Sequence, residues 1–543
     1  MPLKEFTSKL FVGREREIGI IRNAALKAGS GVAGSIILFG RRGAGKTELL
    51  KHAFSELFSG QDRAIPFFYT VSSSFTGLER LCQDYFSHFV LQSLAFIRKD
   101  PALVSSGIYH LEDLKKIAGR SGESWAEDMI DRYLHVSGSG DPFRLFSAAL
   151  SAPRQCYRAT GKPVVVIIDD FHKIRPMVEH TAGTGGDLWT CLEEALKFQF
   201  TPHIIAGFQT DLRAMFFEQS PLGEHLEILN LSGLGRDQAF ALFRDLCGIY
   251  ELEYAESLKN HIGFFNGSPF YIKSFVQAAR QTVSSVREDN FWDIYFREVT
   301  NGKTSTYWTS ILKASIPRFQ LRRPALNVLY QLSTQEGGDV VGGLAERLGI
   351  DSEELDHLTE MLDGAGTIDM GFSTMSFTDD SVLADVVRGL YHREVLAEPS
   401  EKIKDALLGD KGGLEPVPSI PAFDITIPPI PNAESVAIQS LEKIARYFEV
   451  PPDVTGQLQV ALVHLFSGLA SGGTGGERCR LRFMLKDGLL SAELSTPGRG
   501  LALTEEDKAL IEPYVNNIIV EDLTRGSRIV LFKSLNTGLA SAS

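Results

Sequence analysis

The sequence has few cysteines, no long apolar run and no excess of positive charge. Its five cysteines are scattered without a C-x-x-C pair, so we expect neither a zinc site nor a disulfide framework, and a reducing compartment fits. The longest apolar runs, SIILFG and PVVVII, are far shorter than the ~20 residues of a membrane-spanning helix. The net charge of -13 argues against a protein that coats nucleic acids or membranes. Because MPLKEFTSKLFVGRERE has no apolar signal core, we expect a soluble, cytoplasmic protein.

The first part of the chain, residues 1–231, predicts an α/β domain. It alternates apolar runs with helical patterns, which is typical of a parallel sheet. A long stretch from about 75 to 160 is expected to be an inserted, mostly helical element. The predicted strands are Ser35–Phe39, Ile65–Tyr69, Val164–Ile168, His203–Phe208 and Leu226–Leu231.

Two helical parts are expected next. Residues 232–317 predict a small helical lid, because their apolar positions recur at helical spacing. Residues 318–395 give three short helical patterns and then a β-like pair, Thr367–Met370 and Thr374–Phe377. That order is typical of a winged helix.

The remaining sequence predicts a linker and a last domain. Residues 396–432 contain the proline-rich run EPVPSIPAFDITIPPIPNA and are expected to be extended. Residues 433–536 predict an α+β domain in which helices precede strands. No tandem repeat is found.

The segment GRRGAGKT fits the phosphate-binding loop pattern G-x-x-x-x-G-K-[ST], and it stands between an apolar strand and a helical pattern. Its glycines let backbone N–H groups face the phosphates, and the start of a helix favours an anion. Lys46 is expected at the β- and γ-phosphates, and the Thr47 hydroxyl at magnesium. The alternative is a chance glycine-rich turn. The expected contacts are Gly40, Arg41, Arg42, Gly43, Ala44, Gly45, Lys46, Thr47 and Glu48.

Polar residues follow two of the predicted strands. Asp169 and Asp170 come after a fully apolar strand, where a doubly covered parallel sheet binds ligands. We expect Asp169 to hold magnesium and Asp170 to orient the attacking water; the alternative is that both acids merely end the strand. The next strand ends in Gln209 and Thr210, either of which could sense the γ-phosphate unless this is simple loop polarity. The expected catalytic residues are therefore Lys46, Asp170 and Gln209.

Three motifs resemble those of the STAND and origin-recognition P-loop ATPases. FVGRERE resembles a box that packs near the adenine in those families, which implies that Val12, Gly13 and Arg14 flank the base. GSPF resembles a lid motif and implies that Pro269 lies against the nucleotide. FTDDSVLADVV resembles the close of the winged helix. The resemblance covers about residues 8–395, and the preference for ATP over GTP rests on it.

The chain departs from these families in two ways. Relatives often carry an arginine just before the last strand, where Glu224 and His225 stand here, so Arg213 and Arg236 are only candidates for an arginine finger. The candidate recognition helix, DSEELDHLTEMLD, has six acids and no lysine or arginine. A groove lined with phosphates would repel it, so we expect this domain to contact protein, with DNA an unlikely partner.

The last domain resembles the ATP-binding (GHKL) fold of anti-sigma-factor kinases and histidine kinases. The family's functional positions fall on His464, Gly468 and Thr496, and only Gly498 and Gly500 are retained. The resemblance therefore implies a degenerate binding module and a bacterial source. An unrelated α/β domain is the alternative, and His464 is expected to be a packed core residue.

These observations favour a regulatory ATP switch in signal transduction. ATP with Mg²⁺ would be hydrolysed slowly, and the nucleotide state would control protein contacts or self-assembly. In an assembly, Arg41, Arg42 and Arg213 are candidates to reach a neighbour's γ-phosphate. One alternative is a DNA-associated ATPase, for which Arg318, Arg322 and Arg323 form the nearest basic cluster. The other is a non-hydrolysing scaffold that keeps ADP.

Overall fold

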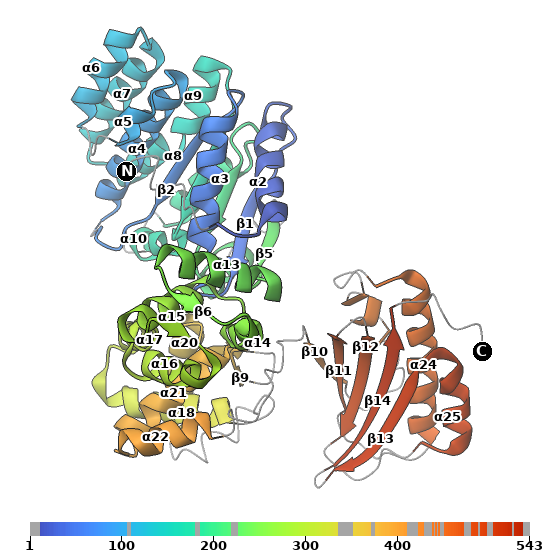
Figure 1. Ribbon diagram of the computed structural model, residues 1–543. Helices are drawn as coiled ribbons and strands as arrows, with labels where there is room; N and C mark the ends of the chain where they lie inside the picture. Colours follow the sequence, from blue (N-terminus) through green and yellow to red (C-terminus); the bar gives the residue numbers. More distant parts are fainter. Residues whose placement is uncertain are drawn as a thin grey trace. The chain divides into compact units, whose positions relative to one another are not determined.

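The computed structural model forms two compact units, Met1–Pro416 and Val417–Ser543 (Figure 1). The division falls inside the predicted 396–432 linker. No helix among the described residues is long and apolar enough to cross a membrane. The residues described are 11–75, 77–105, 110–179, 185–218, 226–334, 351–370, 375–409, 422–427, 437–438, 440–442, 444–445, 450–471, 479–486, 489–496, 503–523 and 526–535.

The first unit contains a parallel sheet of five strands in the order β2-β3-β4-β1-β5. All five predicted strands are present, although β4 ends at Ala206 rather than Phe208. The strand that carries the acidic pair, β3, is buried at every position, as expected for a sheet covered on both faces. The strands are β1 (Ser35–Gly40), β2 (Ile65–Thr70), β3 (Val164–Asp169), β4 (His203–Ala206) and β5 (Leu226–Leu231).

Helices cover the two faces of this sheet unequally. Alternate β3 residues enter two separate cores, Val165 and Ile167 on the side of α2 (Glu15–Ala28) and α3 (Lys46–Gly60), and the others on the opposite side. The predicted helical insertion covers that opposite side. Its helices are α4 (Leu78–Ile97), α5 (Pro101–Ser105), α6 (Leu111–Ser121), α7 (Ser124–Ser137), α8 (Pro142–Leu150) and α9 (Ala152–Thr160), and α10 (Arg175–Glu179) and α11 (Gly185–Leu196) follow β3.

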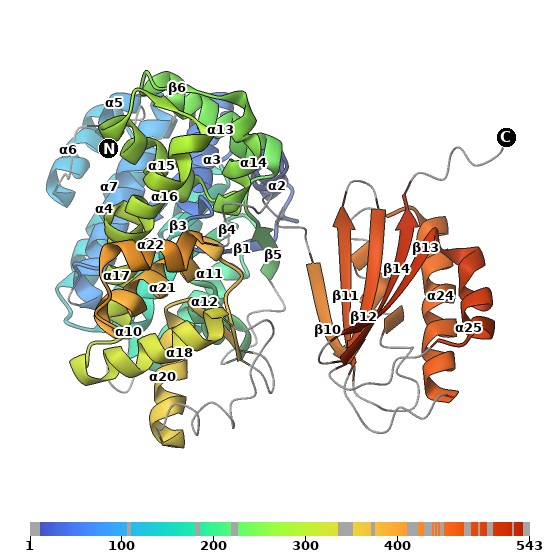
Figure 2. The same cartoon turned by 60° about the horizontal axis from the view of Figure 1, so that its bottom comes forward.

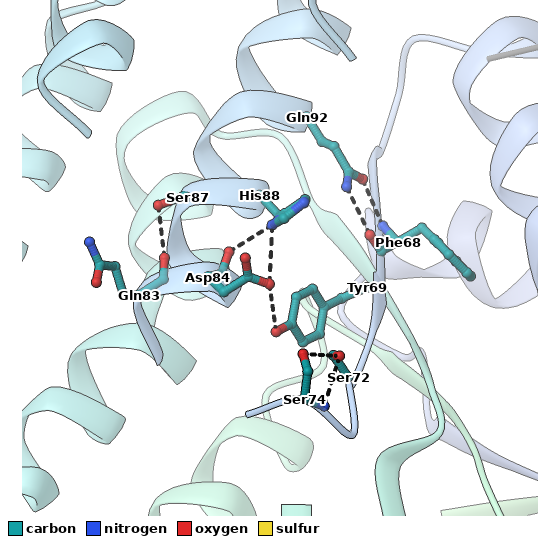
Figure 3. Close-up of polar contacts among 9 residues, drawn as sticks. All are labelled: Phe68, Tyr69, Ser72, Ser74, Gln83, Asp84, Ser87, His88 and Gln92. Carbon is teal, nitrogen blue, oxygen red and sulfur yellow. Dashed lines mark hydrogen bonds and ion pairs between the residues drawn. The ribbon is translucent and has the colours of Figure 1, made fainter. Parts of the chain in front are cut away.

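Figure 3 shows how α4 is fixed to the sheet edge. Strand β2 pairs only with β3 in the described sheet, so the backbone of Phe68 faces away from a partner strand. The buried Gln92 side chain supplies the missing partner: its Nε2 donates to the Phe68 carbonyl and its Oε1 accepts from the Phe68 N–H, both at 2.8 Å. Nearby, the Tyr69 hydroxyl donates to Asp84 Oδ2 at 3.0 Å, and His88 lies beside the same carboxylate.

The helical lid follows the sheet as α13 (Arg236–Ile249), α14 (Lys259–Ile262), α15 (Pro269–Thr282), α16 (Glu288–Asn301) and α17 (Lys303–Ser315). It shares one apolar core with the next part of the chain, which we call the hairpin module. Within that shared core α16 and α21 lie side by side (Figure 2). The hairpin module consists of α18 (Arg322–Thr334), α20 (Ser352–Gly364), β8 (Ile368–Met370), β9 (Met375–Phe377) and α21 (Ser381–Glu394).

The antiparallel pair β8–β9 matches the β-like pair expected for a winged helix, except for Thr374, which lies outside the described residues. Residues 335–350, which belong to the stretch where three helical patterns are expected, also lie outside them. The winged helix therefore stays a prediction.

The prediction of an extended linker over 396–432 is wrong at two places. Helix α22 (Ser400–Leu408) buries Ile403 and Leu407 against the first unit, because its apolar residues recur at helical spacing. Strand β10 (Ala422–Ile427) joins the sheet of the second unit. A strand therefore precedes the helices of that unit, contrary to the order expected.

The second unit has an antiparallel sheet in the order β10-β11-β12-β14-β13. In both views α24 and α25 lie on one face of it (Figures 1 and 2). His464 of α24 stacks on Tyr514, with ring centroids 6.0 Å apart. Gly498 and Gly500 lie outside the described residues, and the GHKL resemblance stays a prediction. The elements are α24 (Pro452–Ser471), β11 (Cys479–Lys486), β12 (Leu489–Thr496), α25 (Glu505–Ile511), β13 (Asn517–Leu523) and β14 (Gly526–Ser534).

Candidate phosphate-binding site

The GRRGAGKT segment forms a tight loop between β1 and α3. Gly43 and Gly45 have φ angles of 77° and 93°, in the left-handed region that favours glycine. The Lys46 Nζ donates to the carbonyls of Gly40 at 2.6 Å and Arg41 at 3.1 Å, so the lysine holds the loop curled around itself. Burial lowers the pKa of the Lys46 ammonium to about 8, although the nearby Asp169 carboxylate opposes this effect. A phosphate would offer this ammonium a stronger partner.

Two residues expected to hold magnesium lie together. Thr47 is at the start of α3 and Asp169 is the last residue of β3, and the two side chains are hydrogen-bonded. Burial raises the pKa of the Asp169 carboxyl, and the bond to Thr47 opposes that rise. A hydroxyl and a carboxylate side by side beside a phosphate-binding loop are oxygen donors that suit Mg²⁺.

Asp170 has a local partner that the sequence analysis did not consider. Its Oδ2 accepts from Lys173 Nζ at 2.6 Å, and its backbone lies in the left-handed region with φ 55°. The spacing of three residues within DDFHK is the signal that could have revealed this pair. A carboxylate has about four lone-pair sites, so this single bond leaves acceptor sites for a water molecule.

The polar residues after β4 separate into two roles. Thr210 Oγ1 donates to the Asp363 carbonyl of the hairpin module at 3.4 Å. Gln209 has no side-chain hydrogen-bond partner within the described part of the chain, and both residues lie in α12 (Gln209–Arg213). Gln209 is therefore the candidate whose side chain is available to contact a ligand.

Residues 12–14 lie where the lid meets the loop. Val12 packs against the lid core, and a side chain at Gly13 would collide with Gln238 of α13. The buried Arg14 donates to the carbonyl of Ala44 at 3.3 Å and to that of Ser232 at 2.6 Å. Its guanidinium therefore joins the phosphate-binding loop to the end of β5.

The lid contacts the loop through the predicted GSPF segment. Ser268 Oγ donates to the Gly43 carbonyl at 3.2 Å. A Cβ added at Gly45 would lie 3.6 Å from the ring of Pro269, and one at Gly43 would lie 3.2 Å from Phe270. Pro269 is thus within contact distance of the loop, and its contact with the nucleotide stays a prediction.

Both loop arginines point to the hairpin module. Arg41 donates to the backbone carbonyl of Asp379, and its Nη2 lies 3.5 Å from the carboxylate of the same residue. Arg42 Nε donates to the Ala365 carbonyl at 3.0 Å, and its guanidinium lies over the Phe208 ring. Burial lowers the pKa of Arg42, and the adjacent Tyr307 opposes that shift.

The other predicted residues are less informative. Glu48 is exposed and lies 3.6 Å from Lys51 on the same helix. Arg213 lies over the Phe39 ring at 5.7 Å, and Arg236 is exposed at the start of α13. Glu224 and His225 lie outside the described residues. None of the described contacts identifies Arg213 or Arg236 as an arginine finger.

Several site residues were missed. His172 accepts from the Phe208 N–H through Nδ1 at 3.4 Å, and burial lowers its pKa to about 4. It joins the acidic pair to the end of β4. Tyr307, Ala365 and Asp379 reach the loop from more than 250 residues away, and no sequence signal pairs them with it.

Residues 10–183 match the AAA ATPase domain family. No curated protein matches the sequence. The chain is also similar to solved structures: Orc1 of Aeropyrum pernix in complex with DNA (12% identity, 71% of this chain, 94% of that chain, TM-score 0.36), a RuvB variant of Thermotoga maritima (15%, 68%, 93%, 0.31) and Cdc6p of Pyrobaculum aerophilum (13%, 73%, 99%, 0.30). The expectation that DNA is an unlikely partner stays a prediction.

Proposed function

We propose that this chain is a regulatory ATPase whose nucleotide state controls how the hairpin module is held. It binds ATP with Mg²⁺ and hydrolyses it slowly. One observation carries the proposal: the adjacent arginines of the phosphate-binding loop, Arg41 and Arg42, both bind the hairpin module through Asp379 and Ala365. The loop that receives the phosphates is therefore also a contact surface for the segment to be switched.

The coupling follows from competition for the loop. Lys46 donates to the Gly40 and Arg41 carbonyls, and it must turn from them to reach a phosphate. The Arg41 backbone is then released while its side chain still holds Asp379. A ligand shifts the position of the hairpin module only by the difference between its affinities for the two arrangements, and this shared loop supplies that difference.

The site residues take the following roles. Lys46 neutralises the β- and γ-phosphates, and Thr47 and Asp169 hold Mg²⁺, which stabilises the charge of the phosphates. Asp170 orients the attacking water and Gln209 senses the γ-phosphate. Lys173 engages one lone pair of Asp170 Oδ2 at 2.6 Å and leaves the other acceptor sites of the carboxylate to orient water.

The position of the base and the nature of the partners are further parts of the proposal. The backbone at Val12–Gly13 and the ring of Pro269 flank the base, whereas the Arg14 side chain holds the loop to β5. Release of the hairpin module exposes surface for a protein partner or a second copy of the chain. The second unit serves as a further partner-binding module.

The first experiment measures nucleotide content, turnover and protease sensitivity of the full chain with ADP and with a slowly hydrolysed ATP analogue. We expect slow turnover that Lys46→Ala abolishes, and analogue-dependent cleavage near the hairpin module. Arg42→Ala should increase cleavage without nucleotide, whereas Arg63→Ala, an exposed arginine outside the loop, should not. If ADP stays bound, nothing turns over and cleavage never changes, the site is a structural one and the switch is wrong.

A further inference from the structure

An exposed aromatic residue lies at the junction between the lid and the hairpin module. Phe319 is 78% exposed, more than any other large apolar side chain among the described residues. It stands in a short 3-10 turn, Phe319–Leu321, between α17 and α18. Cationic residues surround it in the sequence. We call Lys313, Arg318, Phe319, Arg322 and Arg323 the junction patch.

The junction patch is the centre of a long segment without acids. Residues 299–335 contain no aspartate or glutamate, although the whole chain has a net charge of -13. The cations of this segment are Lys303, Lys313, Arg318, Arg322 and Arg323. A polyanion could approach the segment without meeting a carboxylate of the segment itself.

One cation of the patch is held by a hydrogen bond to the backbone, and the others are exposed. Arg322 Nε donates to the Ile316 carbonyl at 3.1 Å, and its guanidinium lies 5.7 Å from the Phe319 ring centroid. Arg318 and Arg323 are exposed, and neither forms an ion pair with any residue that the structure describes. The Arg322 guanidinium therefore lies beside the ring, while the exposed arginines can bind phosphate groups.

We propose that the junction patch binds single-stranded nucleic acid. A base stacks on the Phe319 ring, and Lys313, Arg318 and Arg323 bind the flanking phosphates. Exposed aromatics interleaved with arginines provide this kind of recognition because every base has a flat face and every linkage a charge. An acidic peptide would use the cations but would gain no stacking. The proposal is independent of the ATPase switch.

This proposal concerns a different surface from the acidic helix 351–363. DNA is expected to be an unlikely partner because that helix is acidic, and for the helix this stays a prediction. The junction patch runs from the last turn of α17 into the first turn of α18, outside α20 and the β8–β9 pair. Nucleic acid would therefore bind at the start of α18 rather than through the predicted recognition helix of the hairpin module.

The test is fluorescence anisotropy of the full chain with a labelled oligothymidylate of about 20 nucleotides. Between about 50 and 200 mM salt, the logarithm of the binding constant should fall linearly with the logarithm of salt concentration. Arg318→Ala and Arg323→Ala should each reduce the slope by about 0.7. Phe319→Ala should weaken binding about fivefold or more with the slope unchanged, and Phe319→Trp should restore it.

Matched controls are Arg120→Ala, an exposed arginine of the helical insertion, and Ile249→Ala, an apolar side chain that is 53% exposed. Neither should change the affinity or the slope. Thermal melting of each variant checks its folding. The proposal fails if wild type binds no better than the Arg318→Ala/Arg323→Ala double variant. It also fails if oligoglutamate displaces the oligonucleotide equally well and Phe319→Ala binds as wild type does.

Discussion

The guanidinium carbon of Arg42 lies 3.4 Å from the centroid of the Phe208 ring. Arg42 belongs to the phosphate-binding loop and Phe208 to the segment after β4. The same ring lies 3.8 Å from the His172 ring, centroid to centroid. The Phe208 ring therefore contacts both the phosphate-binding loop and the segment that carries the acidic pair.

Replacing Arg42 by lysine should weaken this junction. A lysine cannot stack a planar group on Phe208 while it also donates to the Ala365 carbonyl. We expect Arg42→Lys to lower the free energy of unfolding of the first unit by about 1–2 kcal/mol. Urea denaturation measures this. Arg154→Lys, at a looser pair 5.9 Å from the Phe198 ring, is the matched control and should cost less; an equal loss at both positions would contradict this explanation.

Nucleotide binding should take up a proton near pH 8–9. Burial lowers the pKa of Lys46 to about 8 without nucleotide, and phosphate charges favour the ammonium and raise that pKa. Affinity should therefore be constant well below pH 8 and fall as the pH rises above it. Isothermal titration calorimetry in buffers of different ionisation enthalpy measures the uptake. An affinity that is unchanged between about pH 7 and 9.5 would exclude this role for Lys46.

Acid should destabilise the sheet through His203. Both ring nitrogens are buried, and burial lowers the pKa of His203 to about 4 from 6.5, an effect that the neighbouring Thr201 backbone opposes. Because the folded pKa is lower, the unfolded chain binds the proton first. This contribution to stability is present above pH 6.5 and is lost as the pH falls towards 4. His203→Leu should reduce the loss of unfolding free energy at acidic pH by up to about 3 kcal/mol. Identical denaturation profiles of wild type and variant across this range would disprove it.

Gly233→Ala should disturb the contact between sheet and lid. The added Cβ would lie 2.2 Å from the Asn266 carbonyl oxygen, a backbone atom that cannot move alone. We expect a loss of about 1–3 kcal/mol in the free energy of unfolding. Gly19→Ala is the control, because a Cβ there meets nothing within 4 Å and lies in helix α2, where alanine should stabilise. The strain explanation predicts opposite signs at the two positions, and equal signs would refute it.

The sheet and the loop could be predicted because their signals are local. Val164–Asp169 is a continuous apolar run, and GRRGAGKT is a contiguous motif. The contact of Arg41 with Asp379 spans 338 residues, and neither residue type reveals the other. The composition of 396–432 concealed two elements, although Ile403 and Leu407 already had the spacing of a helix face. The partners in such long-range contacts meet only in the folded chain, where the core shared with the lid places the hairpin module beside the loop.

The pairing of Gln92 with Phe68 also limits how copies of this chain can join. The side chain occupies the hydrogen-bonding positions that an incoming strand would need at Phe68 of β2. A second copy that added its sheet at this border would have to displace the Gln92 amide and leave it buried without a partner. Edge-to-edge pairing of two copies is therefore disfavoured at β2.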